Sequence, residues 1–148
     1  MTAGNHSVSA AEVEERFEKS KQLRVACLVS CEMGHFTPMV RLAAALEKRG
    51  HHVTILTNNY FKDKCVKMCE QNNIQGDLLF PDADLGFERM MGLNGWKGKD
   101  KGKLLPLQCD QKLADATTAA LKELQPDICV VDTYMTYNQM SADSLGLP

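Results

Sequence analysis

The sequence predicts one α/β domain with a Rossmann-like, doubly wound parallel sheet over residues 23–148. Short apolar runs alternate with longer segments that carry helical periodicity, which is the pattern of strands joined by helices. The strand-like runs are almost continuously apolar, as expected for strands buried on both faces of a sheet. Regular alternation of strand and helix favours parallel pairing with right-handed crossovers.

Composition supports a globular domain and excludes several classes of partner. Of the 148 residues, 44% are hydrophobic and 24% are charged, and the formal net charge is -2. A charge this close to zero implies no general attraction to nucleic acid or to an anionic membrane surface. Four lysines at positions 97, 99, 101 and 103 form a local basic run, which fits a solvated loop better than a phosphate-binding track.

Residues 1–22 are expected to be a polar extension outside the domain, either a short amphipathic helix or a disordered tail. The N-terminus resembles no secretory signal, and no apolar stretch reaches the roughly 20 residues of a membrane span. We therefore expect a cytoplasmic protein whose six cysteines are reduced thiols. Cys65 and Cys69 lie four residues apart, a spacing that suits core packing on one helix face better than a metal site.

The first elements follow directly from the apolar pattern. Residues 23–30 predict a buried strand, and residues 53–57 predict a second strand. Between them, an apolar stripe predicts a helix with Thr37 as its cap, Pro38 at its first position and Gly50 at its end. The stripe comprises Met39, Leu42, Ala43 and Leu46.

The remaining elements continue the alternation. A helix is expected near 60–71, a short strand at 77–80, a helix over 107–124, a fourth strand at 127–132 and a last helix near 138–145. The helix over 107–124 should bury Leu113, Ala116, Ala120 and Leu124. Residues 81–106 are rich in glycine and are either a functional loop or a locally disordered one. The fourth strand should return to lie beside the first, and Gly146-Leu-Pro148 resembles the lead-in to a fifth strand, so the domain is expected to be incomplete.

The crevice between the first and fourth strands is the candidate site, because doubly wound sheets bind ligands where the strand order reverses. His35 follows the first strand, just before its helix, and Asp132 ends the fourth strand. Neighbouring strands lie about 4.8 Å apart, so the two side chains can meet. A neutral imidazole oriented by a carboxylate is a general base. The alternatives are a structural histidine that only forms hydrogen bonds and an aspartate that only caps a helix.

A dinucleotide site is not expected in this crevice. The turn reads Cys31-Glu-Met-Gly-His-Phe-Thr-Pro38, with one glycine where the Gly-x-Gly-x-x-Gly fingerprint has three. Glu32 would also repel a pyrophosphate.

Residues 33–54, which begin Met33-Gly-His-Phe-Thr-Pro38 and end Arg-Gly-His-His-Val-Thr54, closely resemble the opening of the GT-B UDP-glycosyltransferases. The resemblance resumes at Pro126-Asp-Ile-Cys-Val-Val-Asp132 and at Leu145-Gly-Leu-Pro148. It implies the GT-B N-terminal, acceptor-binding domain, with His35 as the base that deprotonates an acceptor hydroxyl and Asp132 as its partner. It further suggests that acceptor contacts come from Gly34, Phe36, Trp96 and Tyr134, since aromatic faces suit apolar aglycones and sugar rings.

The family binds its nucleotide sugar mainly through a second, C-terminal Rossmann-like domain, which these residues do not supply. The resemblance therefore implies the acceptor-side portion of an inverting transferase that is inactive alone, with a hydroxyl acceptor such as a lipid, a sterol or another apolar aglycone. It implies a UDP-sugar donor, no cofactor and no metal, so the Asp-x-Asp sequence at Asp82 and Asp84 is read as coincidence. Two other functions stay open: a non-catalytic acceptor-binding subunit that needs a separate donor-binding chain, and a Rossmann-like module without sugar chemistry.

Overall fold

The computed structural model describes residues 22–81, 111–134 and 136–148. The predicted N-terminal extension, nearly all of the glycine-rich segment 81–106, Trp96 and the lysine run lie outside these residues. The described elements are β1 (Arg24–Leu28), α2 (Met33–Lys48), β2 (His52–Leu56), a 3-10 turn η1 (Asn59–Phe61), α3 (Lys62–Gln71), β3 (Asp77–Leu79), α6 (Gln111–Leu124), β4 (Ile128–Val131) and α7 (Thr136–Ser144).

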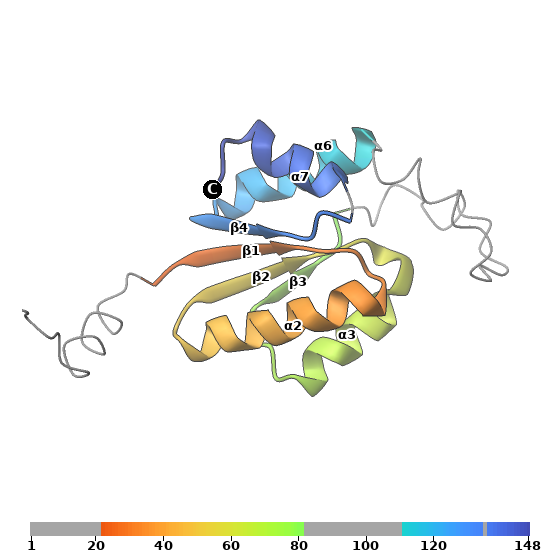
Figure 1. Cartoon of the computed structure of the whole chain (residues 1–148), viewed down its shortest axis with the longest axis vertical. Helices are drawn as coiled ribbons and strands as arrows, with labels where there is room; N and C mark the ends of the chain where they lie inside the picture. Colours follow the sequence, from red (N-terminus) through yellow and green to blue (C-terminus); the bar gives the residue numbers. More distant parts are fainter. Residues whose placement is uncertain (1–21, 82–110, 135) are drawn as a thin grey trace, which may run out of the picture.

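The four strands form one parallel sheet in the order β3-β2-β1-β4, as the sequence predicts (Figure 1). Register places Val25 beside both Val53 and Ile128, so the central strand β1 is paired along its length on both sides. Because β1 and β2 run outward to β3 and the chain then crosses back to β4, the strand order reverses between β1 and β4.

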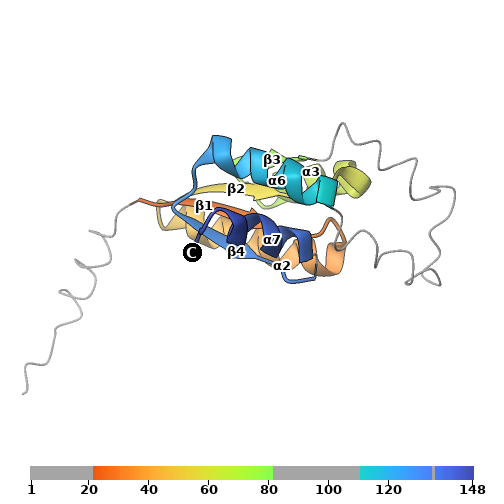
Figure 2. The ribbon, with the colours of Figure 1, turned by 90° about the horizontal axis from the view of Figure 1, so that it is seen from above.

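Helices cover both faces of the sheet, with α2 and α3 on one face and α6 and α7 on the other (Figures 1 and 2). Alternate residues of β1 supply the two cores. Val25, Cys27 and Val29 pack with α2 and α3, whereas Ala26 and Leu28 pack with Leu121 of α6. All of these side chains are buried, which explains why the first strand reads as a continuous apolar run.

Helix α2 begins earlier than its pattern predicts. Glu32 rather than Thr37 is the N-cap residue, and Pro38 lies inside the helix. The extra turn forms because the Glu32 carbonyl accepts hydrogen bonds from the amides of His35 (2.9 Å) and Phe36 (2.8 Å). Pro38 removes only the bond to the carbonyl of Gly34, and water can satisfy that carbonyl because Gly34 is exposed.

This earlier start rotates the buried stripe of α2. Phe36, Met39, Val40 and Ala43 are buried, while Leu42, expected in the core, is 41% exposed. The predicted end of the helix is confirmed, since Gly50 adopts a left-handed φ of 86° just after the Arg49 C-cap.

Helix α6 also buries a face that is rotated from the predicted one. Leu113 is buried as predicted, together with Ala114, Thr117 and Leu121. Ala116, Ala120 and Leu124 are only half-buried, although Ala120 and Leu124 pack against the core. The reason is α7, which packs beside α6. The buried Ser141 hydroxyl lies 2.9 Å from the carbonyl of Ala114, so α7 covers that side of the helix.

A close backbone approach fixes the entry to β3. The Glu47 carboxylate of α2 accepts hydrogen bonds from the amides of Gln75 (3.0 Å) and Gly76 (2.7 Å). At Gly76 a Cβ atom would stand 1.7 Å from the carbonyl oxygen of Val53. Only glycine fits where this turn passes β2.

Candidate functional site

The parallel ladder between β1 and β4 extends one residue beyond the strands. The amide of Asp132 donates to the carbonyl of Leu28 at 2.8 Å. A backbone hydrogen bond thus holds Asp132 at the carboxyl edge of the sheet.

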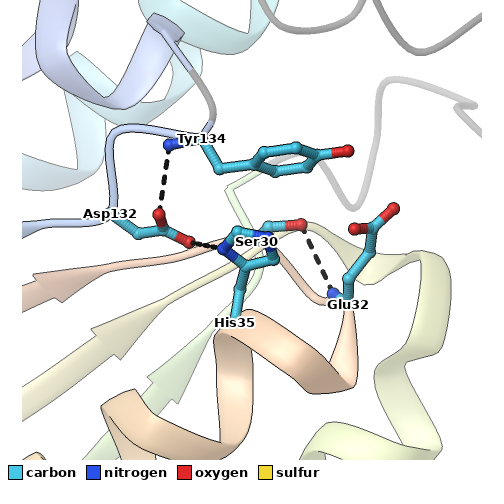
Figure 3. Close-up of polar contacts among 5 residues, drawn as sticks. All are labelled: Ser30, Glu32, His35, Asp132 and Tyr134. Atoms are coloured by element: carbon cyan, nitrogen blue, oxygen red, sulfur yellow. Dashed lines mark hydrogen bonds and ion pairs between the residues drawn. The ribbon is translucent and has the colours of Figure 1, made fainter. Parts of the chain in front are cut away.

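His35 and Asp132 meet at this edge. The His35 Nδ1 lies 2.8 Å from the Asp132 Oδ2, and Figure 3 shows the two side chains pointing toward each other from α2 and from the end of β4. The His35 side chain is 35% exposed and the Asp132 side chain 17%. The predicted contact across the strand-order reversal is present, and the imidazole remains accessible. His35 stands in the first turn of α2, however, and not in a loop before the helix.

Tyr134 completes the arrangement from the turn that follows β4. Its backbone amide donates to the other carboxylate oxygen of Asp132, Oδ1, at 3.1 Å. Its ring stacks on His35, with centroids 4.2 Å apart and an angle of 24° between the planes (Figure 3). The sequence suggested Tyr134 as an acceptor contact but gave no sign that its ring would lie on the imidazole.

The turn that presents His35 is ordered by its own polar groups. The Ser30 hydroxyl accepts a hydrogen bond from the amide of Glu32 at 3.3 Å (Figure 3). Glu32 in turn supplies the carbonyl that begins α2. These two residues were not predicted as part of the site, although a serine two residues before a helix cap is a recognisable turn signal.

The other predicted acceptor contacts have different outcomes. Gly34 is exposed, and a Cβ atom there would meet nothing within 4 Å, so the surface beside His35 is open. Phe36 is fully buried in the core beneath α2. The prediction that Phe36 lines an acceptor wall is thus corrected, because the early start of α2 turns its ring toward the sheet. Trp96 lies outside the described residues.

Four of the thiols that the structure describes are part of the core. Cys27, Cys31, Cys65 and Cys69 are all buried, and Cys65 and Cys69 pack together with β1 and β2, as their spacing predicted. Burial, with a smaller effect of Cys129, raises the pKa of Cys27 to about 12. Burial and then Cys69 raise the pKa of Cys65 to about 12. Protonated, enclosed thiols are poor nucleophiles and poor metal ligands.

Within the described ranges, no group of three or more histidine, cysteine or acidic side chains is placed to hold a metal ion. None of the helices in that part of the chain has the length and apolar character that a bilayer crossing requires.

The couple of His35 and Asp132 can accept one proton and stabilise the resulting charge. A carboxylate oxygen 2.8 Å from Nδ1 favours the neutral tautomer that carries its proton on Nδ1 and its lone pair on Nε2. A doubly wound α/β domain with such a couple where the strand order reverses has the features of a ligand-binding or catalytic domain.

Known proteins refine that description. No family model matches the chain. It is 25% identical over 134 residues to UDP-glycosyltransferase 85A5 of Arabidopsis thaliana, an alignment that covers 84% of this chain and 27% of the relative. It is 26% identical over 141 residues to UDP-glucuronosyltransferase 2A3 of Cavia porcellus, covering 80% of this chain and 26% of that protein. The chain thus spans about a quarter of the length of these curated relatives.

Solved structures of similar fold are also glycosyltransferases. The glycosyltransferase SsfS6 of Streptomyces sp. SF2575 superposes with a TM-score of 0.58 at 17% identity, covering 86% of this chain and 38% of that one. UGT73P12 of Glycyrrhiza uralensis, complexed with glycyrrhetinic acid 3-O-monoglucuronide, gives a TM-score of 0.53 at 21% identity, covering 86% and 27%. The chain has the Rossmann-like fold of GT-B glycosyltransferases, and its predicted resemblance to the UDP-glycosyltransferases is confirmed.

Proposed function

We propose that this chain is the acceptor-side portion of a glycosyltransferase that moves a sugar from a UDP-sugar to a hydroxyl acceptor, with His35 as the general base. The single observation that carries the proposal is the 2.8 Å contact between His35 Nδ1 and Asp132 Oδ2 on an imidazole that is 35% exposed. The resemblance to UDP-glycosyltransferases supplies the reaction class.

The proposed chemistry uses the free ring nitrogen. Nε2 of His35 takes the proton of the acceptor hydroxyl as its oxygen attacks the anomeric carbon, and the bond from that carbon to the departing UDP breaks. Direct displacement inverts the configuration at the anomeric carbon. Asp132 stabilises the imidazolium that forms and keeps the lone pair on Nε2. Tyr134 holds the ring plane, and the exposed Gly34 leaves space for the acceptor beside it.

The donor side of the reaction is also a proposal. The relatives are about four times as long as the aligned part of this chain. The resemblance to GT-B enzymes implies that the nucleotide sugar binds mainly through a second domain. We propose that a complementary donor-binding domain faces the carboxyl edge of the sheet, where His35 and Asp132 lie. The acceptor is proposed to be a small molecule with an apolar body, because Tyr134 offers an aromatic face next to the base.

His35→Ala tests the assignment in the complete transferase that contains this chain, with UDP-glucose as donor and a phenol as probe acceptor. We expect kcat to fall by about 10²–10⁴-fold, the usual contribution of a general base, while the far-ultraviolet circular dichroism is unchanged. His52→Ala is the matched control, since His52 is an exposed histidine at the opposite, amino edge of the sheet. An unaltered rate in His35→Ala would remove His35 from the mechanism. A native protein that binds the acceptor but never transfers sugar would favour a non-catalytic binding subunit.

A further inference from the structure

A small cavity lies at the carboxyl edge of the sheet, on the face covered by α6 and α7. Its apolar walls come from Leu56, Pro81 and Leu113. The space that the centre of a water molecule can reach inside it is about 10 Å³. Roughly 10–15 Å³ is enough to hold one water molecule, so the cavity has room for one group of about that size.

Five polar side chains line this cavity: those of Thr57, Asn58, Thr117, Tyr137 and Asn138. Within the part of the chain that the structure describes, three of them have a buried atom without a hydrogen-bond partner. They are the Thr57 hydroxyl, the Asn58 carboxamide oxygen Oδ1 and the Asn138 carboxamide nitrogen Nδ2. Thr57 and Asn58 follow β2, whereas Asn138 is in α7, so two distant segments contribute. The residues are 3%, 6% and 2% exposed, respectively.

Buried polar atoms without partners are rare in folded proteins, and an occupant that satisfies them is the usual explanation. Such atoms are costly when they stay unpaired. Three orphaned atoms around one small cavity therefore point to a bound group rather than to three separate defects.

The chemistry of the three atoms specifies the occupant. Asn138 offers an N–H donor, Asn58 offers an acceptor, and the Thr57 hydroxyl can do either. An anion would be repelled by the Asn58 oxygen, and a cation would be repelled by the Asn138 N–H group. None of the side chains that line the cavity is charged at neutral pH. The arrangement suits a neutral group that donates and accepts at once.

We propose that this cavity is a binding site for one hydroxyl-sized neutral group, which accepts a hydrogen bond from Asn138 and donates to Asn58 or Thr57. Its occupant is either a resident water molecule or the hydroxyl of a small alcohol. The bound group connects the residues that follow β2, Thr57 and Asn58, to Asn138 of α7. The site does not depend on sugar transfer, so it stands or falls separately from the proposed function.

Water-to-protein cross-relaxation in ¹⁵N-labelled chain tests the site. We expect the side-chain amide protons of Asn138 to show a cross-peak to water with the sign of a long-lived complex. Thr57→Val replaces the hydroxyl with a methyl group of the same shape, and the cross-peak is expected to be lost or to weaken several-fold. Thr118→Val makes the same change on a half-buried residue of α6 that does not line the cavity, and it should leave the signal intact.

Added methanol distinguishes the two possible occupants, a water molecule and the hydroxyl of a small alcohol. If the resident group is exchangeable for an alcohol, added methanol shifts the Asn138 side-chain amide resonance in a saturable way and removes the water cross-peak. If the site is selective for water, the cross-peak persists in methanol. The proposal is overturned if neither a water cross-peak nor a saturable methanol shift is seen, or if Thr57→Val leaves the cross-peak unchanged in a protein with a native amide spectrum.

Discussion

The ring of Tyr134 lies on the imidazole of His35 with centroids 4.2 Å apart, while the amide of the same tyrosine donates to the carboxylate that holds that imidazole. One turn after β4 thus controls His35 in two ways. Asp132 fixes the rotation of the ring through Nδ1, and Tyr134 restricts its tilt by covering one face. A histidine with both constraints has a fixed ring orientation.

Tyr134→Phe should retain the stack, and Tyr134→Ala should lose it. An aromatic pair contributes about 0.5–1.5 kcal/mol, so Tyr134→Ala should lower kcat in the complete transferase by a factor of about 2 to 12. In the chain alone, the ring protons of His35 should lose their upfield ring-current shift in the alanine variant and keep it in the phenylalanine variant. Equal shifts in both variants would show that the stack does not form in solution.

Asp132→Asn should damage the site without unfolding the domain. The asparagine oxygen can still accept from the amide of Tyr134, but its nitrogen then faces Nδ1 of His35 and forces the imidazole proton to Nε2. We expect kcat to fall on the order of 10²–10⁴-fold. The ¹⁵N chemical shifts of the His35 ring should report the changed tautomer.

Asp127→Asn is the control for that substitution. Asp127 lies just before β4, at the opposite edge of the sheet, and pairs with Arg24, whose side chain is 52% exposed. An ion pair with an exposed partner contributes at most about 1 kcal/mol, so this variant should keep its rate. If both variants lost activity equally, the effect would come from general disturbance of β4.

Gly76→Ala and Gly34→Ala should differ sharply in stability. A Cβ atom at Gly76 would meet the Val53 carbonyl oxygen at 1.7 Å, and the turn cannot move without breaking its bonds to Glu47. We expect Gly76→Ala to destabilise the fold by about 3 kcal/mol or more. Gly34 has open space and stands in a helix, so Gly34→Ala should be neutral or should stabilise by about 0.5–1 kcal/mol. Urea unfolding followed by circular dichroism measures both, and similar midpoints would contradict the close approach.

Alkaline pH should weaken the fold through the buried thiols. Burial raises the pKa of Cys27 and of Cys65 from the ordinary value of 9.0 to about 12. Their contribution to stability is complete below pH 9. Between pH 9 and 12 the unfolded thiol loses its proton while the folded thiol keeps it, so the free energy of unfolding falls by about 1.4 kcal/mol per pH unit for each thiol.

Urea unfolding at several alkaline pH values measures that slope. Cys65→Ala should lower stability below pH 9, where the contribution of the buried thiol is complete, and should reduce the slope above pH 9 by the contribution of one thiol. A slope that is the same in the native chain and in this variant would mean that Cys65 is ionised in the folded state.

The sheet and its strand order could be predicted from the sequence because a strand that is buried on both faces is a nearly continuous apolar run. β1 is apolar throughout since Val25 and Ala26 face different cores, and its neighbours are then set by the crossover rule. The contact of His35 with Asp132 was predictable for the same reason, since topology alone brings those two chain positions to one crevice.

Other features depend on geometry that no residue pattern encodes. Pro38 suggested a helix start, but the carbonyl of Glu32 allows a whole further turn before it, and this change moves Phe36 into the core. The stack of Tyr134 depends on the path of the turn after β4. The cavity lined by Thr57 and Asn138 arises only when residues 81 positions apart in the sequence are packed together.

The contact between His35 and Asp132 depends on a single hydrogen bond at the end of the sheet, from the Asp132 amide to the Leu28 carbonyl. If β4 frays at that end, the carboxylate leaves the imidazole although β1, α2 and β2 stay folded. Local opening of this kind costs less than global unfolding. The rate at which the Asp132 amide exchanges with deuterium should therefore measure how often the contact between His35 and Asp132 is lost.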